Sequence, residues 1–415
     1  MARARHGPGT STADVVVVGA GPAGAATAML LAEAGYDVVL LDRARFPRDK
    51  VCGEYLSPEG SRLLDRLGVL KGVETAGARP LRGMRIVAPD GTTLVGDYPR
   101  SGRYRGYRDH ALAVPRWMFD AALVEQARAL PVRVREGFRV TDLLLEGRRV
   151  TGVEGLDGAA AGPPERIRAR LVVGADGRTS VVARRLGLVR PHPWLHRLAL
   201  VTYAEGVAHD PERGEIFLAP PAYSIVNPVG DGRVNLSLVI PAIEGLRHKG
   251  DLAGYFDRAV AALPYLCDRL RRSHRVGPVR ALGPLAYRVE PPRHDGVLLV
   301  GDALGFLDPF TGEGIFTALR SAELAAEVAA AALRANDVSA PALAPAHARR
   351  RAEFAAKDRV SILLQRLIAR RRLAVAVARR LARRPAQLEL LMGVIGDFVP
   401  AREVLSLRFL ARLLF

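Results

Sequence analysis

Three glycines near the start of the chain have a spacing that suits a phosphorylated ligand. Gly19, Gly21 and Gly24 fit the pattern G-x-G-x-x-G and directly follow four valines at 15–18. In this pattern the first glycine permits a tight turn, the second lets backbone approach a pyrophosphate, and the third lets a helix pack closely on a strand. Asp42, after the next apolar run, can accept hydrogen bonds from a ribose. These residue types in this order predict a dinucleotide site.

Two aspartates later in the chain also follow apolar runs and are flanked by glycines. Residues 171–173 lead into Gly174-Ala175-Asp176-Gly177, and residues 296–300 lead into Gly301-Asp302. The G-D turn after the second of these strands can aim the Asp302 carboxylate at the hydroxyl groups of a ligand. For Asp176 an ordinary turn is the alternative interpretation.

The elements that must position these residues form an α/β pattern. The valines at 15–18 are typical of a parallel strand buried on both faces, and residues 25–34 are rich in helix formers. A second apolar strand at 38–41 ends at Asp42. A further strand at 296–300 precedes a long alanine-rich helix, so the nucleotide-binding unit is expected to be discontinuous in sequence.

The segments between these elements predict an inserted antiparallel unit. Asp90-Gly91 lies between two apolar runs, which is a hairpin signal, and residues 235–238 alternate after a glycine-rich turn. We therefore expect a nucleotide-binding domain and a β-sheet domain, followed by a helical basic region entered through a Pro/Ala linker at 335–346. Their boundaries are 12–80, 111–189 and 286–334 for the first, 81–110 and 190–285 for the second, and 335–415 for the third.

Composition narrows the environment of the protein. The 415 residues carry a formal net charge of +18 and only two cysteines, Cys52 and Cys267, which argues against a disulfide framework and favours a reducing, cytoplasmic location. The polar N-terminal segment 1–13 lacks the apolar core of a secretory signal. Residues 15–32 carry no charge, but their glycines and proline favour strand, loop and helix over a membrane span. The nine histidines show no metal-ligand spacing, so no metal site is expected.

The order of motifs resembles the flavoproteins that share the p-hydroxybenzoate hydroxylase fold. After the glycine fingerprint come V-P-R ending at Arg116, then G-A-D-G-R at 174–178, G-D-A at 301–303 and D-P-F-T-G-E-G at 308–314. Within this group, the run that begins at Gly301 and the segment FPRDKVCGEYLSPEG resemble the geranylgeranyl reductase family. The resemblance covers about residues 14–330. It implies an α/β fold with a discontinuous, Rossmann-like FAD-binding domain, an inserted antiparallel β-sheet substrate domain and a helical C-terminal tail.

Details of the motifs separate the subfamilies. The hydroxylases usually carry a histidine where this chain has Gly305, and the halogenase motif W-x-W-x-I-P is absent, since Trp117 and Trp194 are isolated. The reductases carry a motif close to aromatic-x-W-x-F-P. Here residues 223–228 keep the tyrosine and the proline but lose both inner aromatics, which leaves the substrate open.

The resemblance implies FAD as the cofactor. Asp302 would reach the ribityl hydroxyls, Arg116 the pyrophosphate or the adenosine half, and Gly312 and Gly314 would bring a positive helix end to the flavin pyrimidine. Because only one complete G-x-G-x-x-G is present, NAD(P)H or another reductant is expected to bind transiently. The expected FAD-binding residues are Gly19, Gly21, Pro22, Ala23, Gly24, Asp42, Arg43, Cys52, Gly53, Arg116, Asp176, Gly301, Asp302, Gly312, Gly314 and Ile315.

The implied reaction is hydride transfer from reduced flavin to a double bond of an isoprenoid-like or other apolar substrate. Cys52 and Tyr223 are expected to face the substrate as catalytic residues. The Cys52 thiol could donate a proton or shape the pocket, and a buried small hydrophobe is the alternative. Two other functions stay open: an FAD-dependent monooxygenase that hydroxylates an aromatic or polyketide molecule, and a membrane-associated flavin-binding protein without its own catalysis.

The tail combines an apolar helical face with many arginines. Residues 346–415 contain 16 Lys and Arg but 5 Asp and Glu, and apolar residues between Val360 and Ile368 recur at helical spacing. Such a helix can make peripheral contact with an anionic membrane, or it can cap the substrate domain with a solvated basic face. Nucleic-acid binding is not expected, because aromatic residues do not alternate with the Lys and Arg residues of the tail. No nucleic-acid-binding motif accompanies these basic residues either. The sequence does not indicate the oligomeric state.

Overall fold

A seven-stranded sheet carries the glycine fingerprint in the computed structural model, which describes residues 10–100, 102–158 and 162–414. Most of the N-terminal segment 1–13 therefore lies outside the described residues. The sheet runs in the order β8-β2-β1-β11-β10-β9, and β20 pairs with β11. Its strands are β1 (Thr10–Val18), β2 (Val38–Asp42), β8 (Val132–Glu136), β9 (Phe138–Glu146), β10 (Arg149–Asp157), β11 (Glu165–Gly174) and β20 (Val297–Leu299).

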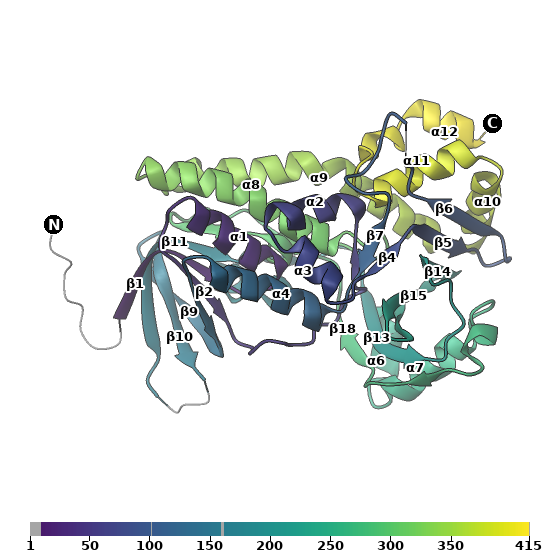
Figure 1. The fold of residues 1–415 in the computed structure, drawn as a ribbon, viewed down its shortest axis with the longest axis horizontal. Helices are drawn as coiled ribbons and strands as arrows, with labels where there is room; N and C mark the ends of the chain where they lie inside the picture. Colours follow the sequence, from purple (N-terminus) through teal and green to yellow (C-terminus); the bar gives the residue numbers. More distant parts are fainter. Residues whose placement is uncertain (1–9, 101, 159–161, 415) are drawn as a thin grey trace.

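The strands that carry the site are parallel. β1 pairs in parallel with both β2 and β11, and β20 pairs in parallel with β11. The last residues of the four strands therefore lie at one edge of the sheet: Val18, Asp42, Gly174 and Leu299. The valines of β1 are almost fully buried because helices cover one face of the sheet and β-structure the other. The helices near this sheet include α1 (Pro22–Glu33), α2 (Pro58–Arg66), α3 (Leu70–Thr75), α4 (Arg116–Ala129) and α8 (Gly314–Arg334), as Figure 1 shows. The short α5 (Val181–Arg185) packs on β9.

A second, eight-stranded sheet contains the segments predicted to be inserted. Its order is β17-β13-β16-β15-β14-β5-β6, with β18 against β13. The pairs are antiparallel except for β14 and β5, which lie in parallel and join the two inserted segments into one sheet. Its strands are β5 (Gly83–Val87), β6 (Thr93–Asp97), β13 (Arg197–Glu205), β14 (Arg213–Ala219), β15 (Ala222–Gly230), β16 (Arg233–Pro241), β17 (His274–Arg275) and β18 (Arg280–Leu282), and α6 (Ala242–Arg247) and α7 (Leu252–Ala261) lie beside it.

Two small sheets lie where the large ones meet, and both carry loops that reach the site. The strand order is β3-β7-β4 in one of them and β12-β19-β21 in the other. Their strands are β3 (Tyr55–Leu56), β4 (Arg79–Leu81), β7 (Ala111–Ala113), β12 (Val189–Pro191), β19 (Tyr287–Val289) and β21 (Gly305–Phe306).

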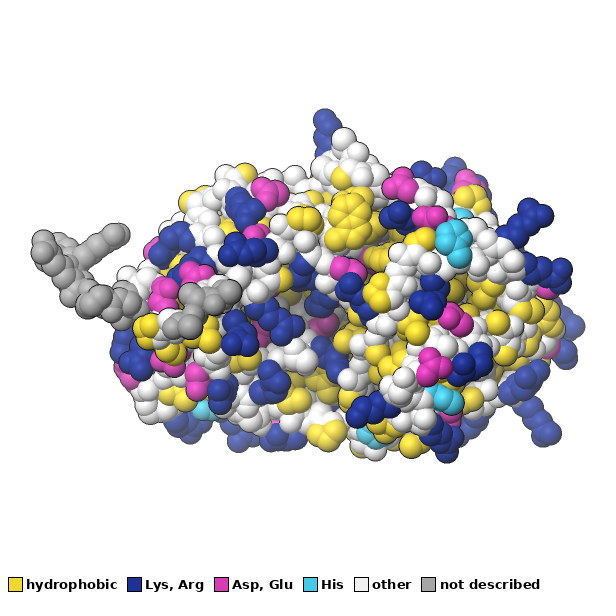
Figure 2. All heavy atoms as spheres, turned by 90° about the horizontal axis from the view of Figure 1, so that it is seen from below, with side chains coloured by type: hydrophobic (Ala, Val, Ile, Leu, Met, Phe, Trp, Pro, Cys, Tyr) yellow, Lys and Arg dark blue, Asp and Glu magenta, His cyan; other side chains and the backbone are white. Residues whose placement is uncertain are grey.

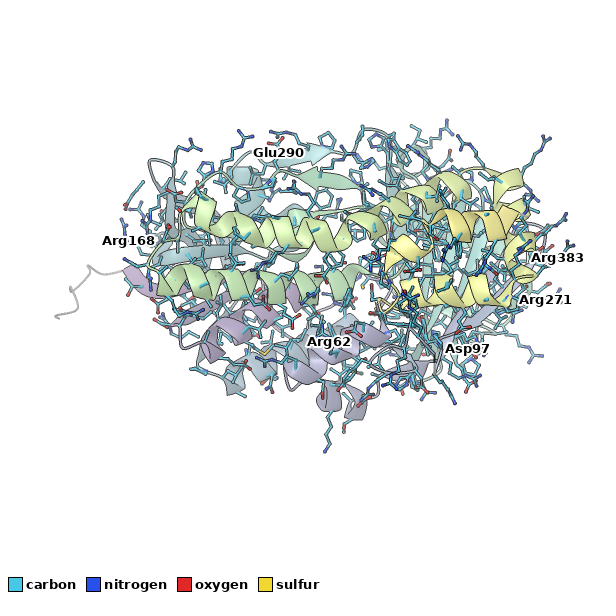
Figure 3. The ribbon with its side chains drawn as sticks, turned by 90° about the horizontal axis from the view of Figure 1, so that it is seen from above. Arg62, Asp97, Arg168, Arg271, Glu290 and Arg383 are labelled. Carbon is cyan, nitrogen blue, oxygen red and sulfur yellow. The ribbon has the colours of Figure 1, made fainter. Side chains whose placement is uncertain are left out.

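The tail is helical and packs on the second sheet. It consists of α9 (Ala340–Ile368), α10 (Arg371–Ala382), α11 (Pro385–Ile395) and α12 (Leu407–Leu414). α8 and α9 run side by side along one face, and α10 to α12 gather at its end, where Arg383 points outward (Figure 3). Val360, Ile368 and Met392 are buried in one core with residues of β5, β6 and β15, so the apolar face caps the substrate domain. Among the described residues, no helix is both long and apolar enough to cross a membrane.

The Pro/Ala linker predicted at 335–346 is wrong in most of its length. α8 ends at Arg334, and α9 already begins at Ala340 and contains Pro345. Pro341 is in the first turn, where a proline loses no intrahelical hydrogen bond, whereas Pro345 lies inside the helix and removes one, a loss that this 29-residue helix tolerates. The linker is therefore confined to residues 335–339.

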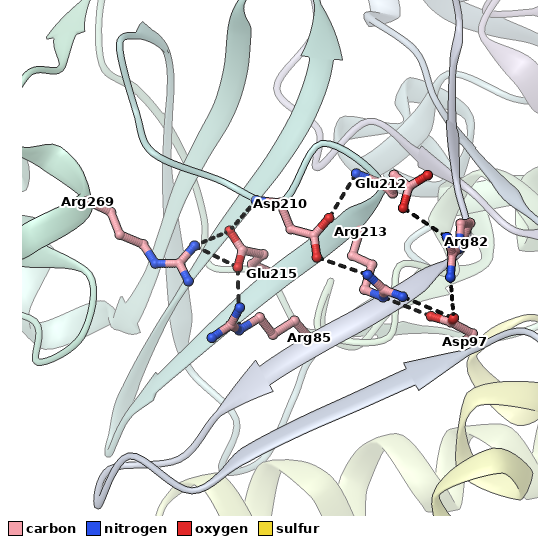
Figure 4. A network of polar contacts seen from close by, with 8 residues as sticks. All are labelled: Arg82, Arg85, Asp97, Asp210, Glu212, Arg213, Glu215 and Arg269. Atoms are coloured by element: carbon pink, nitrogen blue, oxygen red, sulfur yellow. Dashed lines mark hydrogen bonds and ion pairs between the residues drawn. The ribbon is translucent and has the colours of Figure 1, made fainter.

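A network of ion pairs ties β5, β6 and β14 to the loop after α7 (Figure 4). Glu215 on β14 is fully buried, and its two carboxylate oxygens accept hydrogen bonds from Arg269 Nη1 at 2.7 and 2.6 Å. Arg85 Nε lies 3.7 Å from the same carboxylate, and the Asp210 N–H donates to it at 3.2 Å. A carboxylate this deeply buried needs such partners, because leaving it unpaired costs several kcal/mol.

Replacing Arg269 with methionine is expected to lower the free energy of unfolding by about 2 kcal/mol, since Arg85 compensates only in part for the lost cation. The matched control is Arg233→Met on the same sheet, whose partner Glu205 is solvent-accessible and whose loss should cost less than about 0.5 kcal/mol. Denaturant unfolding of both variants measures the difference. Equal costs for the two would show that the Glu215 network adds no stability.

Candidate functional site

Two adjoining cavities lie at the edge where the parallel strands end. The outer cavity has a volume of about 1150 Å³ and extends over the ends of β1, β2 and β11. The inner cavity, about 160 Å³, lies between the start of α8 and the face of the second sheet. Six residues line both cavities, so the two form one continuous site: Gly21, Lys50, Val51, Ala175, Arg178 and Leu282.

The glycine fingerprint is built by close packing. Gly24, in the first turn of α1, would place a Cβ only 1.7 Å from the Gly19 carbonyl oxygen. Gly19 has a φ of 101°, and a Cβ there would lie 2.6 Å from the Ala175 carbonyl oxygen. Gly21 differs, because only the tip of the Arg48 side chain comes within 4 Å of the place that a Cβ would take, at 3.7 Å. The first and third glycines thus serve packing, and the second leaves open space for a ligand.

The outer cavity offers acceptors at the ends of β2 and β11. Asp42 Oδ2 accepts the Ala20 N–H at 2.8 Å and fixes the loop between β1 and α1. Asp176 Oδ2 accepts the Val181 N–H at 2.6 Å, while its Oδ1 is buried and has no hydrogen-bond partner among the described residues. Burial raises the pKa of Asp176, although the hydrogen bonds to Ser180 and Val181 oppose this shift. A buried, unpartnered oxygen in a cavity wall fits a ligand that brings a hydroxyl group.

Positive charge surrounds these acceptors. Figure 2 shows Lys and Arg side chains around a hollow between the two halves of this face. The basic residues that line the outer cavity are Arg43, Arg48, Lys50, Arg139, Arg178, Arg184, Arg185 and Arg280. The N-terminus of α1 points to the junction of the two cavities, because Pro22 and Ala23 line the inner one. A helix N-terminus among guanidinium groups is an anion site suited to a pyrophosphate.

The inner cavity is largely apolar and lies at the N-terminus of α8. Gly312, Gly314 and Ile315 line it, and Gly314 has only the Phe306 ring within 4 Å of the position of a Cβ. The positive end of this 21-residue helix therefore faces the cavity and favours negative charge there. Asp302 lines the same cavity. Apolar side chains make up much of the remaining wall: Val51, Ala199, Val201, Ile225, Val239, Leu282, Leu285 and Phe306.

The Cys52 loop is held in the cavity wall by two asparagines of the second sheet. Asn235 Nδ2 donates to the Cys52 carbonyl at 2.9 Å, and Asn227 Nδ2 donates to the carbonyls of Gly53 and Glu54 at 2.9 and 3.1 Å. The Glu54 N–H points to Cys52 Sγ at 3.3 Å. The second sheet thus fixes the backbone of a loop that leaves the first sheet.

Glu54 is the functional candidate that sequence reasoning missed. Its φ is 57°, its side chain is fully buried, and it lines the inner cavity. Its Oε1 accepts the Arg116 N–H at 2.8 Å and the Tyr203 hydroxyl at 2.5 Å, and its Oε2 accepts Asn235 Nδ2 at 3.1 Å. Burial raises the pKa of Glu54 to about 6 against these hydrogen bonds. The motif C-G-E had marked the loop, but nothing in the sequence places a tyrosine and an asparagine beside its glutamate.

Arg116 lies at the inner cavity and not at the outer one, where contact with the adenosine half would require it. Its Nε and Nη2 both donate to Asp120 at 2.8 Å, one helical turn further along α4. Burial alone would lower the pKa of Arg116, but Asp120 and Cys52 beside it raise that pKa. Lys50 is close to the same group, and burial together with Arg116 lowers its pKa.

The prediction that Tyr223 faces the substrate does not match its position. Tyr223 is fully buried and is not among the residues that line either cavity. Its hydroxyl donates to Asp308 Oδ1 at 2.5 Å, and its ring meets the Phe310 ring edge-on at 5.1 Å between centroids. Tyr223 therefore supports the loop before α8. Ile225, two residues further on the same face of β15, lines the inner cavity instead.

Asp308 makes this support dependent on pH. Burial raises its pKa to about 6, although the Tyr223 hydroxyl lowers it, and Oδ2 has no hydrogen-bond partner among the described residues. Because the folded protein holds this proton more tightly than the unfolded chain, the stabilisation is present below pH 4 and is lost as pH rises through about 6. Asp308→Asn should remove this slope, so the variant gains about 2–3 kcal/mol over the wild type between pH 4 and 7.5. Unfolding free energies across that range test it, and parallel curves would contradict it.

The expected residues divide by position. Gly19, Asp42, Arg43 and Asp176 line the outer cavity, and Gly21 lines both. Gly24 and Gly301 line neither and act through packing, since a Cβ at Gly301 would lie 2.7 Å from Ala23 Cβ. The inner cavity brings together Pro22, Ala23, Cys52, Gly53, Arg116, Asp302, Gly312, Gly314 and Ile315.

Comparison with known proteins agrees with this geometry. The family model of the FAD binding domain matches residues 12–357. The chain is 34% identical over 342 residues, 79% of each chain, to digeranylgeranylglycerophospholipid reductase 2 of Methanopyrus kandleri. It is 31% identical over 363 residues to 6-methylpretetramide 4-monooxygenase of Streptomyces rimosus, covering 86% of this chain and 84% of that one.

The fold is shared with a flavin-dependent brominase whose structure is solved. The TM-score is 0.81 over 94% of each chain at 21% identity. The acceptors, the anion site at α1 and the space beside Gly21 fit FAD, and the family model and the relatives agree with that assignment. The chain therefore belongs to the geranylgeranyl reductase-like family of FAD-dependent oxidoreductases.

Proposed function

We propose that this oxidoreductase reduces a carbon–carbon double bond of an isoprenoid-like or other apolar substrate. The observation that carries the proposal is the inner cavity, an apolar pocket at the N-terminus of α8 that also contains Cys52 and Glu54. FAD, when bound, would supply hydride chemistry to a double bond placed there. The 34% identity to a reductase named for a geranylgeranyl lipid supports an apolar substrate.

The two cavities would bind different parts of FAD. Asp42 and Asp176 would accept hydrogen bonds from hydroxyl groups at the adenosine end, and Gly21 with the start of α1 would bind the pyrophosphate. Asp302 and the N-terminus of α8 would hold the flavin end in the inner cavity. This set provides hydroxyl acceptors, an anion site and a positive helix end in one continuous space.

The substrate enters a small space. The inner cavity is well below the 300–1,000 Å³ of typical small-molecule pockets, so it suits the reacting part of a substrate and not the full length of a prenyl chain. The remainder of an extended substrate would lie outside the cavity described. The apolar lining stabilises an alkene segment by removing it from water.

NAD(P)H is the proposed electron donor. Arginines from three separate elements line the outer cavity, Arg139 on β9, Arg184 on α5 and Arg280 on β18. Such a group offers more positive charge than one pyrophosphate requires and would attract a second phosphorylated molecule. Anaerobic bleaching of the flavin by NADPH or NADH tests the donor.

The reaction is tested by anaerobic turnover. The FAD-loaded protein is reduced with NADPH or dithionite without oxygen and mixed with a geranylgeranyl lipid, and the product is weighed by mass spectrometry. We expect a gain of two hydrogen atoms per reduced double bond without oxygen. A product that appears only with oxygen and contains an added oxygen atom would overturn the reductase proposal.

A monooxygenase is the second candidate, favoured by the compact cavity and by the 31% identity to 6-methylpretetramide 4-monooxygenase. It would take an aromatic or polyketide molecule in the same inner cavity. Substrate-stimulated NAD(P)H oxidation that requires oxygen is its signature, so the anaerobic experiment separates the two candidates.

For the tail we propose peripheral contact with an anionic membrane through its arginine-rich outer face. Leu363 and Leu373 are 49% and 43% exposed on α9 and α10, near Arg366, Arg370 and Arg372 in sequence. Exposed leucines among arginines suit the interface of anionic lipids. Flotation of the full chain with phosphatidylglycerol vesicles at low salt tests the contact, and failure to float would contradict it.

A further inference from the structure

We propose that Glu54 delivers the proton that completes reduction of the double bond and that Tyr203 renews it from solvent. This inference rests on the proposed function, because only alkene reduction needs a proton at carbon. It assigns the proton transfer to a residue that the sequence did not indicate, in place of Cys52.

Glu54 has the position of a proton donor. Glu54 is one of the residues that line the inner cavity, together with Gly312, Gly314 and Ile315 at the start of α8. Oε1 already accepts two hydrogen bonds, from the Arg116 N–H and the Tyr203 hydroxyl, whereas Oε2 accepts only one, from Asn235. A proton on Oε2 therefore keeps every contact at Oε1.

The surroundings of Glu54 shift its pKa towards the neutral range. The nearest cation, Arg116, is engaged by Asp120 through two hydrogen bonds and is not free to pair with Glu54. The other charged or titratable residues of the inner cavity are Lys50, Cys52, Tyr55, Arg178 and Asp302, and Asp49 acts on the neighbouring Tyr203. The pKa of Glu54 near 6, set mainly by burial, places the donor within reach of physiological pH.

Tyr203 connects Glu54 to the outside. The tyrosine is on β13 of the substrate domain, half-buried, and its hydroxyl donates to Glu54 Oε1 at 2.5 Å. Burial raises its pKa, and the neighbouring charges of Glu54 and Asp49 raise it further, so the hydroxyl stays protonated. Asp49 is 31% exposed and paired with Arg280 at the rim of the outer cavity. Asp49 is close enough for its charge to act on Tyr203, so the proposed route runs from the rim through this hydroxyl to the buried carboxylate.

The step balances with the two-electron donor of the proposed function, the reduced flavin. As a hydride forms a C–H bond at one alkene carbon, the π electron pair forms a C–H bond at the other carbon with the Glu54 proton. The O–H bond of Glu54 breaks and leaves a carboxylate. Tyr203 then gives its proton to that carboxylate and takes one from water, so no charge accumulates in the cavity.

Glu54→Gln tests the donor, with Glu205→Gln on β13 as the matched control. We expect single-turnover alkene reduction by the reduced enzyme to fall at least about 100-fold in Glu54→Gln, with flavin reduction by NADPH unchanged. Glu205 is on the surface, paired with Arg233, and its variant should match the wild type. Tyr203→Phe should slow repeated turnover about 10-fold or more, while Tyr255→Phe, its control on α7, should not.

An infrared titration of the FAD-free protein gives a readout that does not depend on activity. A protonated carboxyl band that loses intensity with a midpoint near pH 6 is expected in the wild type, and the difference between the wild type and Glu54→Gln isolates the Glu54 component from that of Asp308, which titrates in the same range. Tyr203→Phe keeps the Glu54 carboxyl group but removes the hydroxyl that donates to it, so the pH midpoint of the carboxyl band should move. This variant tests the contact between Glu54 and Tyr203 even if Glu54→Gln folds poorly.

The outcomes separate this inference from the proposed function. If Glu54→Gln forms the product with two added hydrogens as fast as the wild type does, the proton relay from Tyr203 through Glu54 is overturned, while the proposed function stands. If Cys52→Ser has at the same time lost this activity, the proton comes from the Cys52 thiol. Absence of such a product from the wild type would overturn the proposed function and the relay together. A carboxyl band that has no Glu54 component at pH 5 would also contradict the relay.

Discussion

Gly24→Ala is expected to yield protein without bound FAD. A Cβ at position 24 would lie 1.7 Å from the Gly19 carbonyl oxygen and 3.0 Å from Ala175 Cβ. No rotamer relieves this contact, because both partners are backbone or Cβ positions in the core. α1 would have to move away from the end of β1, which separates its N-terminus from the junction of the two cavities.

The loss in the free energy of unfolding should exceed the 1–3 kcal/mol that overpacking of a side chain usually causes, so we expect a loss of at least about 3 kcal/mol. FAD binding should weaken by about 100-fold or more. Flavin absorbance per protein after purification and the thermal midpoint with and without added FAD measure both effects. Gly72→Ala is the matched control, since Gly72 is in α3 with nothing within 4 Å of its Cβ position. That variant should be neutral or slightly stabilised. Full FAD content in Gly24→Ala would show that the third glycine is not needed for close packing.

The part of the site that the sequence predicts is the part made from short segments. The fingerprint, the valine strand and Asp42 are within 30 residues, and the spacing of the glycines dictates both the turn and the packing of α1. Asp176 and Asp302 could also be predicted, because each follows a buried strand and parallel strands end at one edge. The fold class followed from the same order of elements.

What could not be predicted depends on contacts between distant segments. Glu54 meets Tyr203 and Asn235 across 149 and 181 residues, and the register of the second sheet, which no local pattern specifies, brings them together. Tyr223 was misplaced for the same reason, since the motif at 223–228 marks the strand but not which of its residues reaches the cavity. The helical start of α9 was missed because proline in a first turn looks like a linker in sequence.

The tail also contributes to the site through one buried ion cluster. Lys357 on α9 is buried between Glu313, which precedes α8, and Asp397, after α11, and its Nζ lies 3.7 Å from Glu313 and in contact with Asp397. Burial lowers the pKa of Lys357, and Glu313 opposes that shift. Burial likewise raises the pKa of Glu313, and Lys357 lowers it. Glu313 stands between Gly312 and Gly314, which both line the inner cavity.

Lys357→Met is therefore expected to destabilise the protein by about 3–5 kcal/mol, the cost of leaving buried carboxylates without their cation. The triple variant that adds Glu313→Gln and Asp397→Asn should recover most of that loss, because it removes the unpaired charges as well. Arg349→Met, which breaks an exposed pair with Glu327, is the control and should cost less than about 0.5 kcal/mol. Denaturant unfolding measures all three.

The same variant links the tail to cofactor binding. If Lys357 holds Glu313 in place, Lys357→Met should also weaken FAD binding, and the triple variant should restore stability more fully than affinity, because its neutral side chains no longer fix the start of α8 by charge. Titration of the FAD-free variants with FAD measures this. A stability loss with unchanged FAD affinity would limit the cluster to holding the tail, whereas a joint loss would make the tail part of the flavin site.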